Sequence, residues 1–258
     1  MRSSRTLGAL AVVGFGLLPA LDAVAAPRAP AAAGQLATQL PQDLEVELAL
    51  SALPPHLRPQ ATIHVLDPAK GFTVFRAGTN GFHTFVARTG DDTFRGTWPL
   101  TSYRDDILYP VAFDEAGARA QMRIFFDAAK LQAQGMAPDE LKRVMRQRYA
   151  GAHYKEPQRA GISYMLSPIL RTFGDPDRGD QAVTVNYPHV MYYAPHVADR
   201  DIGSDARGGM YPHVNLHGPH GYINQPLGMA ERAQLNLEYK DMLARLCALK
   251  VEWCLPAS

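Results

Sequence analysis

Three closely spaced runs of strand-forming residues limit the folds open to this chain. Residues 61–66, 72–77 and 82–88 are rich in Val, Ile, Thr and Phe, and short turn-like segments separate them. The second of these segments contains Asn80-Gly81. Asn-Gly is a strong signal for a β-hairpin because both residues tolerate positive φ. The pattern therefore predicts an antiparallel β-meander over residues 61–88.

Helical patterns lie on both sides of this region. The spacing of Leu44, Leu48 and Leu50 predicts a short helix over 43–53 that stops at the following prolines. Residues 115–134 and 138–151 predict two more helices, each ending at a glycine. A final helix is expected near the C-terminus, where an apolar stripe recurs with helical spacing. The stripe consists of Leu235, Tyr239, Met242, Leu246 and Leu249.

The order of these elements predicts the fold class. Short apolar runs return between 161 and 227, with strand candidates at 162–166, 183–185, 190–193 and 222–224, and an acidic turn at 175–180. Strands, helices, strands and a helix in this order predict an α+β fold, with an antiparallel sheet or sheets packed with three to four helices. We expect a single globular domain over 41–258, a size that can bury a proper core.

The first 25 residues have the features of a secretory signal peptide. Arg2 and Arg5 precede an uncharged segment over 7–21, and the small residues Ala23-Val24-Ala25 follow it. We expect cleavage after Ala25, and the Ala- and Pro-rich residues 26–40 should form a flexible leader. The uncharged segment is shorter than the roughly 20 residues that cross a bilayer, which argues against an uncleaved anchor. The sequence thus predicts a protein that is secreted or periplasmic.

Export changes the expected state of Cys247 and Cys254, the two cysteines of the chain. In an oxidising compartment such a pair is more often joined than free. On one straight helix the two positions would be about 10.5 Å apart along the axis, which is too far for a disulfide. We therefore expect the helix to end near residue 249 or 250 and the chain to fold back. Two buried thiols are the alternative.

Residues 187–224 contain a near-repeat that is rich in histidine. Tyr187-Pro188-His189-Val190 is followed by Pro195-His196, and Tyr211-Pro212-His213-Val214 is followed by Pro219-His220 at the same interval. We call these segments the first and second repeat units. We expect them to form two equivalent strand–loop units that lie side by side.

Histidine is a common metal ligand, and the repeat could gather several imidazoles round one zinc or copper ion. Within one strand, His213 and His217 would be about 13 Å apart. This separation argues against a site in which both of them bind the same ion. In the alternative interpretation each Pro-His-Val begins a strand and each imidazole bonds to a main-chain carbonyl. The candidate metal ligands are His189, His196, His213, His217 and His220.

Tyrosines and asparagines share the same region, as they do in clefts that bind small molecules. These residue types also fill half-buried faces of sheets, which is the alternative. The candidate ligand-binding residues are Tyr187, Tyr193, Tyr211, Asn215 and Tyr222.

The charge balance and the absence of known motifs limit the functions further. With 26 Lys and Arg against 25 Asp and Glu, we expect no nucleic-acid partner. After signal cleavage no segment should span a membrane, and no nucleophile, dinucleotide or P-loop motif occurs. Our main hypothesis is an exported soluble protein that binds a small ligand or metal through residues 187–224. The alternatives are a metal-dependent hydrolase with Asp199 or Asp201 as base, and a structural or interaction domain without a site.

Overall fold

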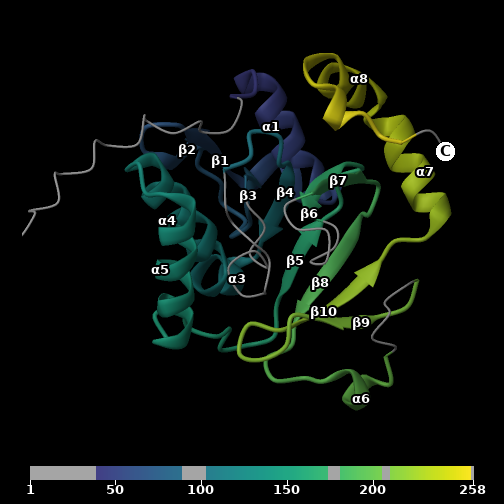
Figure 1. Ribbon diagram of the computed structural model, residues 1–258. Helices are drawn as coiled ribbons and strands as arrows, with labels where there is room; N and C mark the ends of the chain where they lie inside the picture. Colours follow the sequence, from purple (N-terminus) through teal and green to yellow (C-terminus); the bar gives the residue numbers. More distant parts are fainter. Residues whose placement is uncertain (1–38, 89–102, 174–180, 205–209, 257–258) are drawn as a thin grey trace, which may run out of the picture.

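A computed structural model describes residues 39–88, 103–173, 181–204 and 210–256. It has a mixed α+β fold around an eight-stranded, mainly antiparallel sheet (Figure 1), which confirms the predicted class. The strand order is β2-β1-β3-β4-β5-β8-β10-β9, and β6 pairs with β7 in a second, small sheet. The strands are β1 Thr62–Asp67, β2 Gly71–Arg76, β3 His83–Ala87, β4 Tyr109–Phe113, β5 Ile162–Met165, β6 Leu170–Phe173, β7 Ala182–Val185, β8 His189–Tyr193, β9 His213–Asn215 and β10 Tyr222–Pro226.

The described helices outnumber the three to four that the sequence predicted. Two predicted helices are each divided, at Gln121 and at Tyr239. None of the helices in the described ranges is long and apolar enough to cross a bilayer. The helices are α1 Gln42–Ser51, η1 Pro55–Gln60, α3 Glu115–Ala120, α4 Met122–Ala133, α5 Pro138–Ala150, α6 Asp199–Ile202, α7 Met229–Glu238, α8 Lys240–Leu249 and η3 Val251–Trp253.

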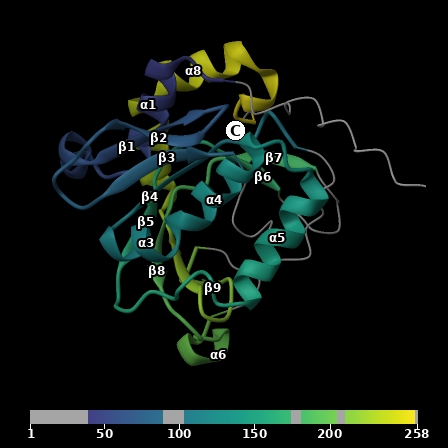
Figure 2. The same ribbon diagram turned by 90° about the vertical axis from the view of Figure 1, so that its left-hand side faces the viewer.

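Helices cover both faces of the main sheet (Figure 2). Phe85 and Val86 are neighbours on β3, so their side chains point to opposite faces. Phe85 packs with Phe125 of α4, and Val86 belongs to a core that Leu44 of α1 and Met242 of α8 complete. The sheet is thus the middle layer, with α3 and α4 on one side and α1 and α8 on the other.

The predicted β-meander over 61–88 is only half right. All three strands form, and β1 and β2 make the first hairpin. The hairpin expected at Asn80-Gly81 is wrong, because β3 pairs in parallel with β1 on its other edge. The loop instead binds η1: Asn80 Nδ2 donates to Leu57 O at 2.8 Å, and the backbone N–H of Asn80 donates to Gln60 O at 3.3 Å.

The strands β4 and β6 were not among the predicted ones. Strand β4 lies in the middle of the sheet although it contains Pro110, which pairs with Val86. Proline cannot donate to a ladder and is normally confined to edges, so a central strand was not expected here. The signal peptide, most of the leader over 26–40 and the turn over 175–180 lie outside the described residues.

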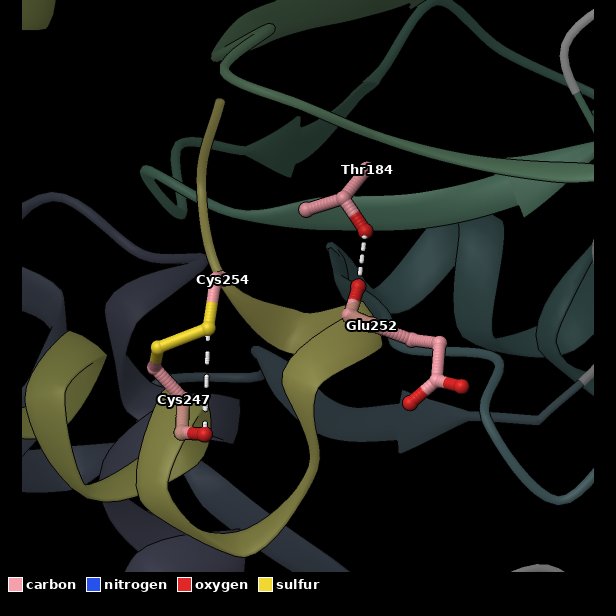
Figure 3. The surroundings of a disulfide bond; sticks show 4 residues. All are labelled: Thr184, Cys247, Glu252 and Cys254. Carbon is pink, nitrogen blue, oxygen red and sulfur yellow. Dashed lines mark hydrogen bonds between the residues drawn. A yellow bond between two sulfur atoms is a disulfide. The ribbon is translucent and has the colours of Figure 1, made fainter. Parts of the chain in front are cut away.

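The C-terminal cysteines form the predicted disulfide (Figure 3). The Cα atoms of Cys247 and Cys254 are 4.4 Å apart, because α8 ends between them and η3 folds back. The turn also bonds to the small sheet, since the hydroxyl of Thr184 donates to the carbonyl of Glu252. The disulfide therefore closes the turn after α8, and the hydrogen bond from Thr184 joins this turn to the small sheet.

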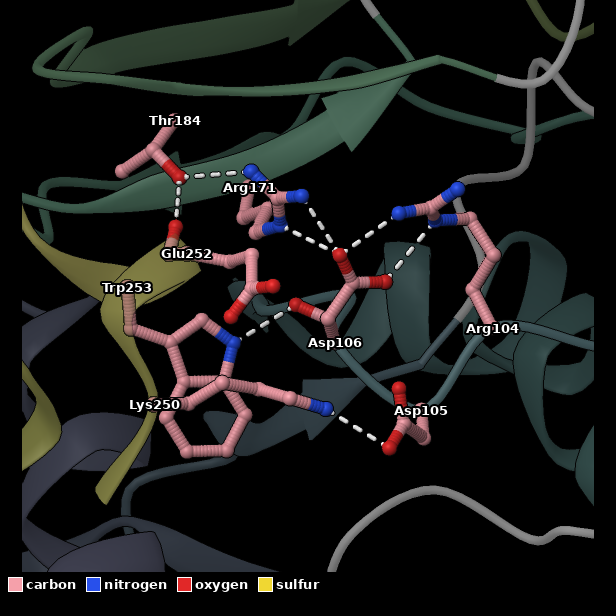
Figure 4. Close-up of polar contacts among 8 residues, drawn as sticks. All are labelled: Arg104, Asp105, Asp106, Arg171, Thr184, Lys250, Glu252 and Trp253. Carbon is pink, nitrogen blue, oxygen red and sulfur yellow. Dashed lines mark hydrogen bonds and ion pairs between the residues drawn. The ribbon is translucent and has the colours of Figure 1, made fainter.

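The turn that the disulfide closes contacts a buried cluster of charged side chains (Figure 4). Trp253 is fully buried, and its Nε1 donates to Asp106 O at 2.7 Å. The carboxylate of Asp106 accepts hydrogen bonds from Arg104 at 2.7 Å and from Arg171 Nε at 2.7 Å. Burial alone would raise the pKa of Asp106, but these two guanidinium groups outweigh it and lower the pKa. The cluster joins the segment before β4, the β6–β7 hairpin and the C-terminus.

Candidate functional site

The two repeat units do not lie directly beside each other, because β10 runs between β8 and β9. His189 on β8 is opposite Pro226, and His213 on β9 is opposite Asn224. Pro226 and Asn224 are two residues apart on β10, so both histidines project from the same face of the sheet. Their backbones are nevertheless two strand spacings apart, about 10 Å.

The first histidine of each unit bonds to its own main chain. His189 Nδ1 lies 2.7 Å from Tyr187 O, and His213 Nδ1 lies 3.1 Å from Tyr211 O. A carbonyl only accepts, so in both rings Nδ1 carries the hydrogen. This is the alternative interpretation of the Pro-His-Val motif, in which the imidazole bonds to a carbonyl at the start of a strand.

The other three candidate metal ligands lie in separate surroundings. His196 Nε2 is 3.1 Å from Glu156 Oε2, and His217 Nε2 is 3.7 Å from Asp199. His220 is 3% exposed and packs edge-on against Tyr149. Among the residues that the structure describes, no three His, Cys, Asp or Glu side chains are placed to hold a metal ion. The structure therefore gives the zinc or copper hypothesis no geometric support.

Three of the five candidate ligand-binding residues lie in one row across the sheet, because Tyr222 of β10 is opposite both Tyr193 of β8 and Asn215 of β9. Tyr187 and Tyr211 lie outside this row. The ring of Tyr187 packs against His189 and lies under the guanidinium of Arg232. Tyr211 is 81% exposed, whereas Asn215 and Tyr222 line an enclosed cavity of only about 10 Å³. Such a cavity has room for about one water molecule at most.

Tyr193 is buried, and its hydroxyl supports the sheet. Its hydroxyl donates to the carbonyl of Ile162 at 2.9 Å and lies 3.1 Å from Asp114 Oδ1. Burial, with Tyr222 and Asp114 nearby, raises the pKa of Tyr193 far above its usual value. The phenol therefore stays neutral and ties β8 to β5 and to the start of α3.

A larger cleft lies beside α3, at a place the sequence did not indicate. It encloses about 460 Å³ and is lined by Ala116, Arg119 and Ala120 of α3 and by residues 155–159. Ala116, Ala120 and Pro157 are buried, so they form an apolar floor. Arg119, Lys155 and Arg159 are exposed and surround it with positive charge. The volume falls in the range of sites for small molecules.

Asp114 fixes one wall of this cleft. It caps α3 by accepting from the backbone N–H of Gly117 at 2.8 Å, and its other carboxylate oxygen accepts from Ile162 N at 3.1 Å. Gly117 and Gly161 let the chain approach Tyr193 closely, because a Cβ at Gly117 would be 1.8 Å from the Tyr193 hydroxyl. The local sequence Asp-Glu-Ala-Gly thus had a readable cap signal, but no signal for a cleft.

Two carboxylates accompany the cations of the cleft. Glu115 binds Arg119 at 2.9 Å and Arg159 at 3.7 Å. Glu156, which lines the cleft, is the partner of His196. His196 therefore reaches this cleft through the contact of its ring with Glu156.

Searches of protein families, curated proteins and solved structures found no match to this chain.

Proposed function

We propose that this is an exported protein that binds a small organic molecule in the cleft beside α3. The observation that carries the proposal is a cleft of about 460 Å³ with an apolar floor and charged groups around its edge. This combination is typical of small-molecule sites, where apolar surface supplies affinity and a few polar groups supply orientation. Ligand binding was also the main hypothesis from the sequence, but the site proposed here is the cleft between α3 and residues 155–159 and not the histidine-rich repeat.

The hydrolase alternative finds less support. It needs a metal-bound water with a carboxylate nearby, and the candidate base Asp199 instead accepts a hydrogen bond from Ser204 and lies 3.7 Å from His217. No metal-binding group accompanies it in the described ranges. The structural or interaction-domain alternative remains if the cleft binds nothing.

The disulfide supports export as part of the proposal. Bonds between cysteines persist in oxidising compartments and are rare in the cytosol, and the pair here is at bonding distance. Mass spectrometry of protein recovered outside the cytoplasm tests this. The mature chain should begin at Ala26 and lack the two thiol hydrogens, whereas an intact N-terminus would contradict signal cleavage.

A neutral fluorescent probe tests the cleft. Phenylnaphthylamine, which brightens in apolar surroundings, should bind the wild-type protein at the apolar floor. Ala120→Leu places extra carbon atoms in the cleft and should weaken binding about tenfold or more. Ala230 is an exposed alanine of α7, and Ala230→Leu is the matched control that should bind as wild type does.

Thermal unfolding of both variants separates loss of the cleft from loss of the fold. Equal affinities for wild type and a folded Ala120→Leu protein, or no binding by wild type, would contradict the proposal.

A further inference from the structure

We infer that the ligand of this cleft carries an acidic group, and that protonation of His196 strengthens its binding. The inference rests on the proposed function and names the ligand class and the regulation of that same site. Three cationic side chains from two segments of the chain surround one apolar floor. An amphipathic anion, such as an organic acid with an apolar body, fits that arrangement.

The positions of the two arginines already show how a carboxylate can be held. Arg119 comes from α3 and Arg159 from the segment before β5, yet both guanidinium groups reach the carboxylate of Glu115. Guanidinium groups match the planar, two-oxygen geometry of a carboxylate. Both pairs with Glu115 are largely exposed, so each contributes little stability and can be exchanged for a ligand.

Glu156 is the group that opposes an anionic ligand. It lines the same cleft as the cations, and at neutral pH its negative charge repels another anion. His196 Nε2 lies 3.1 Å from Glu156 Oε2. A charged imidazolium at that distance offsets the charge of Glu156, and imidazole is the side chain whose charge ordinarily changes between about pH 5 and 8.

The backbone holds His196 at this place. Its φ is +63°, a left-handed conformation that non-glycine residues seldom adopt, and its backbone N–H donates to Gly218 O at 2.9 Å. Such strain persists only where the surrounding structure imposes it, and it occurs often at functional sites. The backbone therefore holds residue 196 at this place, and the contact with Glu156 orients its ring.

The other charged groups near this pair come from four segments of the chain. His217 precedes Gly218, whose carbonyl accepts from the backbone of His196, and the His217 ring lies 3.7 Å from Asp199. The remaining groups are Arg119 and Glu115 of α3, Lys155 and Arg159 of the segment before β5, and Arg200 and Asp201 of α6.

Two probes with the same ring system test the inference. Anilinonaphthalene sulfonate carries an anionic group that phenylnaphthylamine lacks, so the difference between them reports the charge of the cleft. The anionic probe should bind wild type about two- to fivefold more tightly near pH 5 than near pH 8, whereas the neutral probe should show no such change. Circular dichroism at both pH values verifies that the protein stays folded.

Three variants locate the effect. His196→Gln keeps a hydrogen-bond donor near Glu156 but cannot become charged, so it should remove the pH dependence and leave weak binding. Glu156→Gln should bind the anionic probe at pH 8 as tightly as wild type does at pH 5. His213→Gln changes the half-buried first histidine of the second repeat unit and should keep the full pH dependence.

The outcomes separate the two claims. Binding of both probes with no pH dependence, or with pH dependence that survives in His196→Gln, would overturn the inference and leave the proposed function in place. Failure of both probes to bind would overturn the proposed function as well.

Discussion

The two repeat units show how one short sequence takes two positions in a fold. In both units the first histidine bonds through Nδ1 to the carbonyl of the tyrosine two residues earlier. The surroundings nevertheless differ. His189 is 4% exposed on an inner strand, whereas His213 is half-buried at the start of the edge strand β9. The Tyr-Pro-His segment thus determines its own local hydrogen bond and not its burial.

The second histidine of each unit differs even more. His196 is exposed, is strained in the left-handed region and contacts the cleft through Glu156. His220 is buried against Tyr149 of α5. The repeat therefore places one imidazole at the surface beside a cleft and the other in the core, and the neighbours of each unit decide which.

The largest expected difference between the units is in acid stability. Burial lowers the pKa of His189 from 6.5 to about 4. Below pH 6.5 the imidazole takes up a proton in the unfolded chain but not in the folded protein. The free energy of unfolding therefore decreases as the pH is lowered from about 6.5 to about 4. The total loss is about 3 kcal/mol.

Urea unfolding between about pH 7 and 4 measures this loss. His189→Asn keeps a donor for the Tyr187 carbonyl but does not titrate, so its stability should depend less on pH. His213→Asn in the other unit should change this dependence only slightly, because the charge of His213 is a lesser cause of the lowered pKa of His189 than burial is. His64 is a separate buried imidazole, with a pKa that burial lowers to about 4, and its contribution should remain in both variants. Equal pH dependence in all three proteins would refute the assignment to His189.

The tyrosines of the two units should differ by a smaller amount. Tyr187 packs against His189 and Arg232, so Tyr187→Ala should cost about 2 kcal/mol of unfolding free energy. Tyr211→Ala removes an exposed ring and should stay within about 0.5 kcal/mol of wild type. Chemical denaturation at neutral pH makes the comparison, and similar losses for both variants would show that the second unit is also packed.

The smallest expected effect concerns the backbone of His196. Glycine adopts positive φ without the Cβ clash that other residues suffer. His196→Gly should therefore be about 1 kcal/mol more stable than His196→Ala, since both variants lose the exposed contact with Glu156. Thermal unfolding of the two proteins gives the difference. If the alanine variant were the more stable one, residue 196 would not be strained.

Local patterns predicted much of the fold. The short helix before Pro54, the helix after Pro138 and the strands near 62, 72 and 83 all form, because these segments carry their own caps, breaks or alternation. The disulfide was expected from export, and the end of the helix followed from spacing, since two cysteines seven residues apart can bond only if the helix ends between them. The parallel pairing of β1 with β3 and the central strand β4 were missed, because each depends on contacts with distant parts of the chain.

The candidate site was predicted far less well. The sequence identified residues capable of binding, such as His196 and Tyr193. It also predicted that the two repeat units lie side by side around one site, but β10 separates them. The cleft itself is built from alanines, a proline, three cations, a glutamate and a glutamine, and these residue types are too common on helices and loops to mark a site.

The amino-acid sequence alone determined the local features of this protein: its helices and most of its strands, the turn that closes the disulfide, and the carbonyl bond of each Tyr-Pro-His segment. Their causes lie within a few residues of chain. The tertiary structure alone decided that β10 separates the two repeat units, that His220 is buried while His196 is exposed, and that α3 and residues 155–159 enclose a cleft. Burial and cavity shape arise from surfaces that meet only after folding, so no local pattern encodes them.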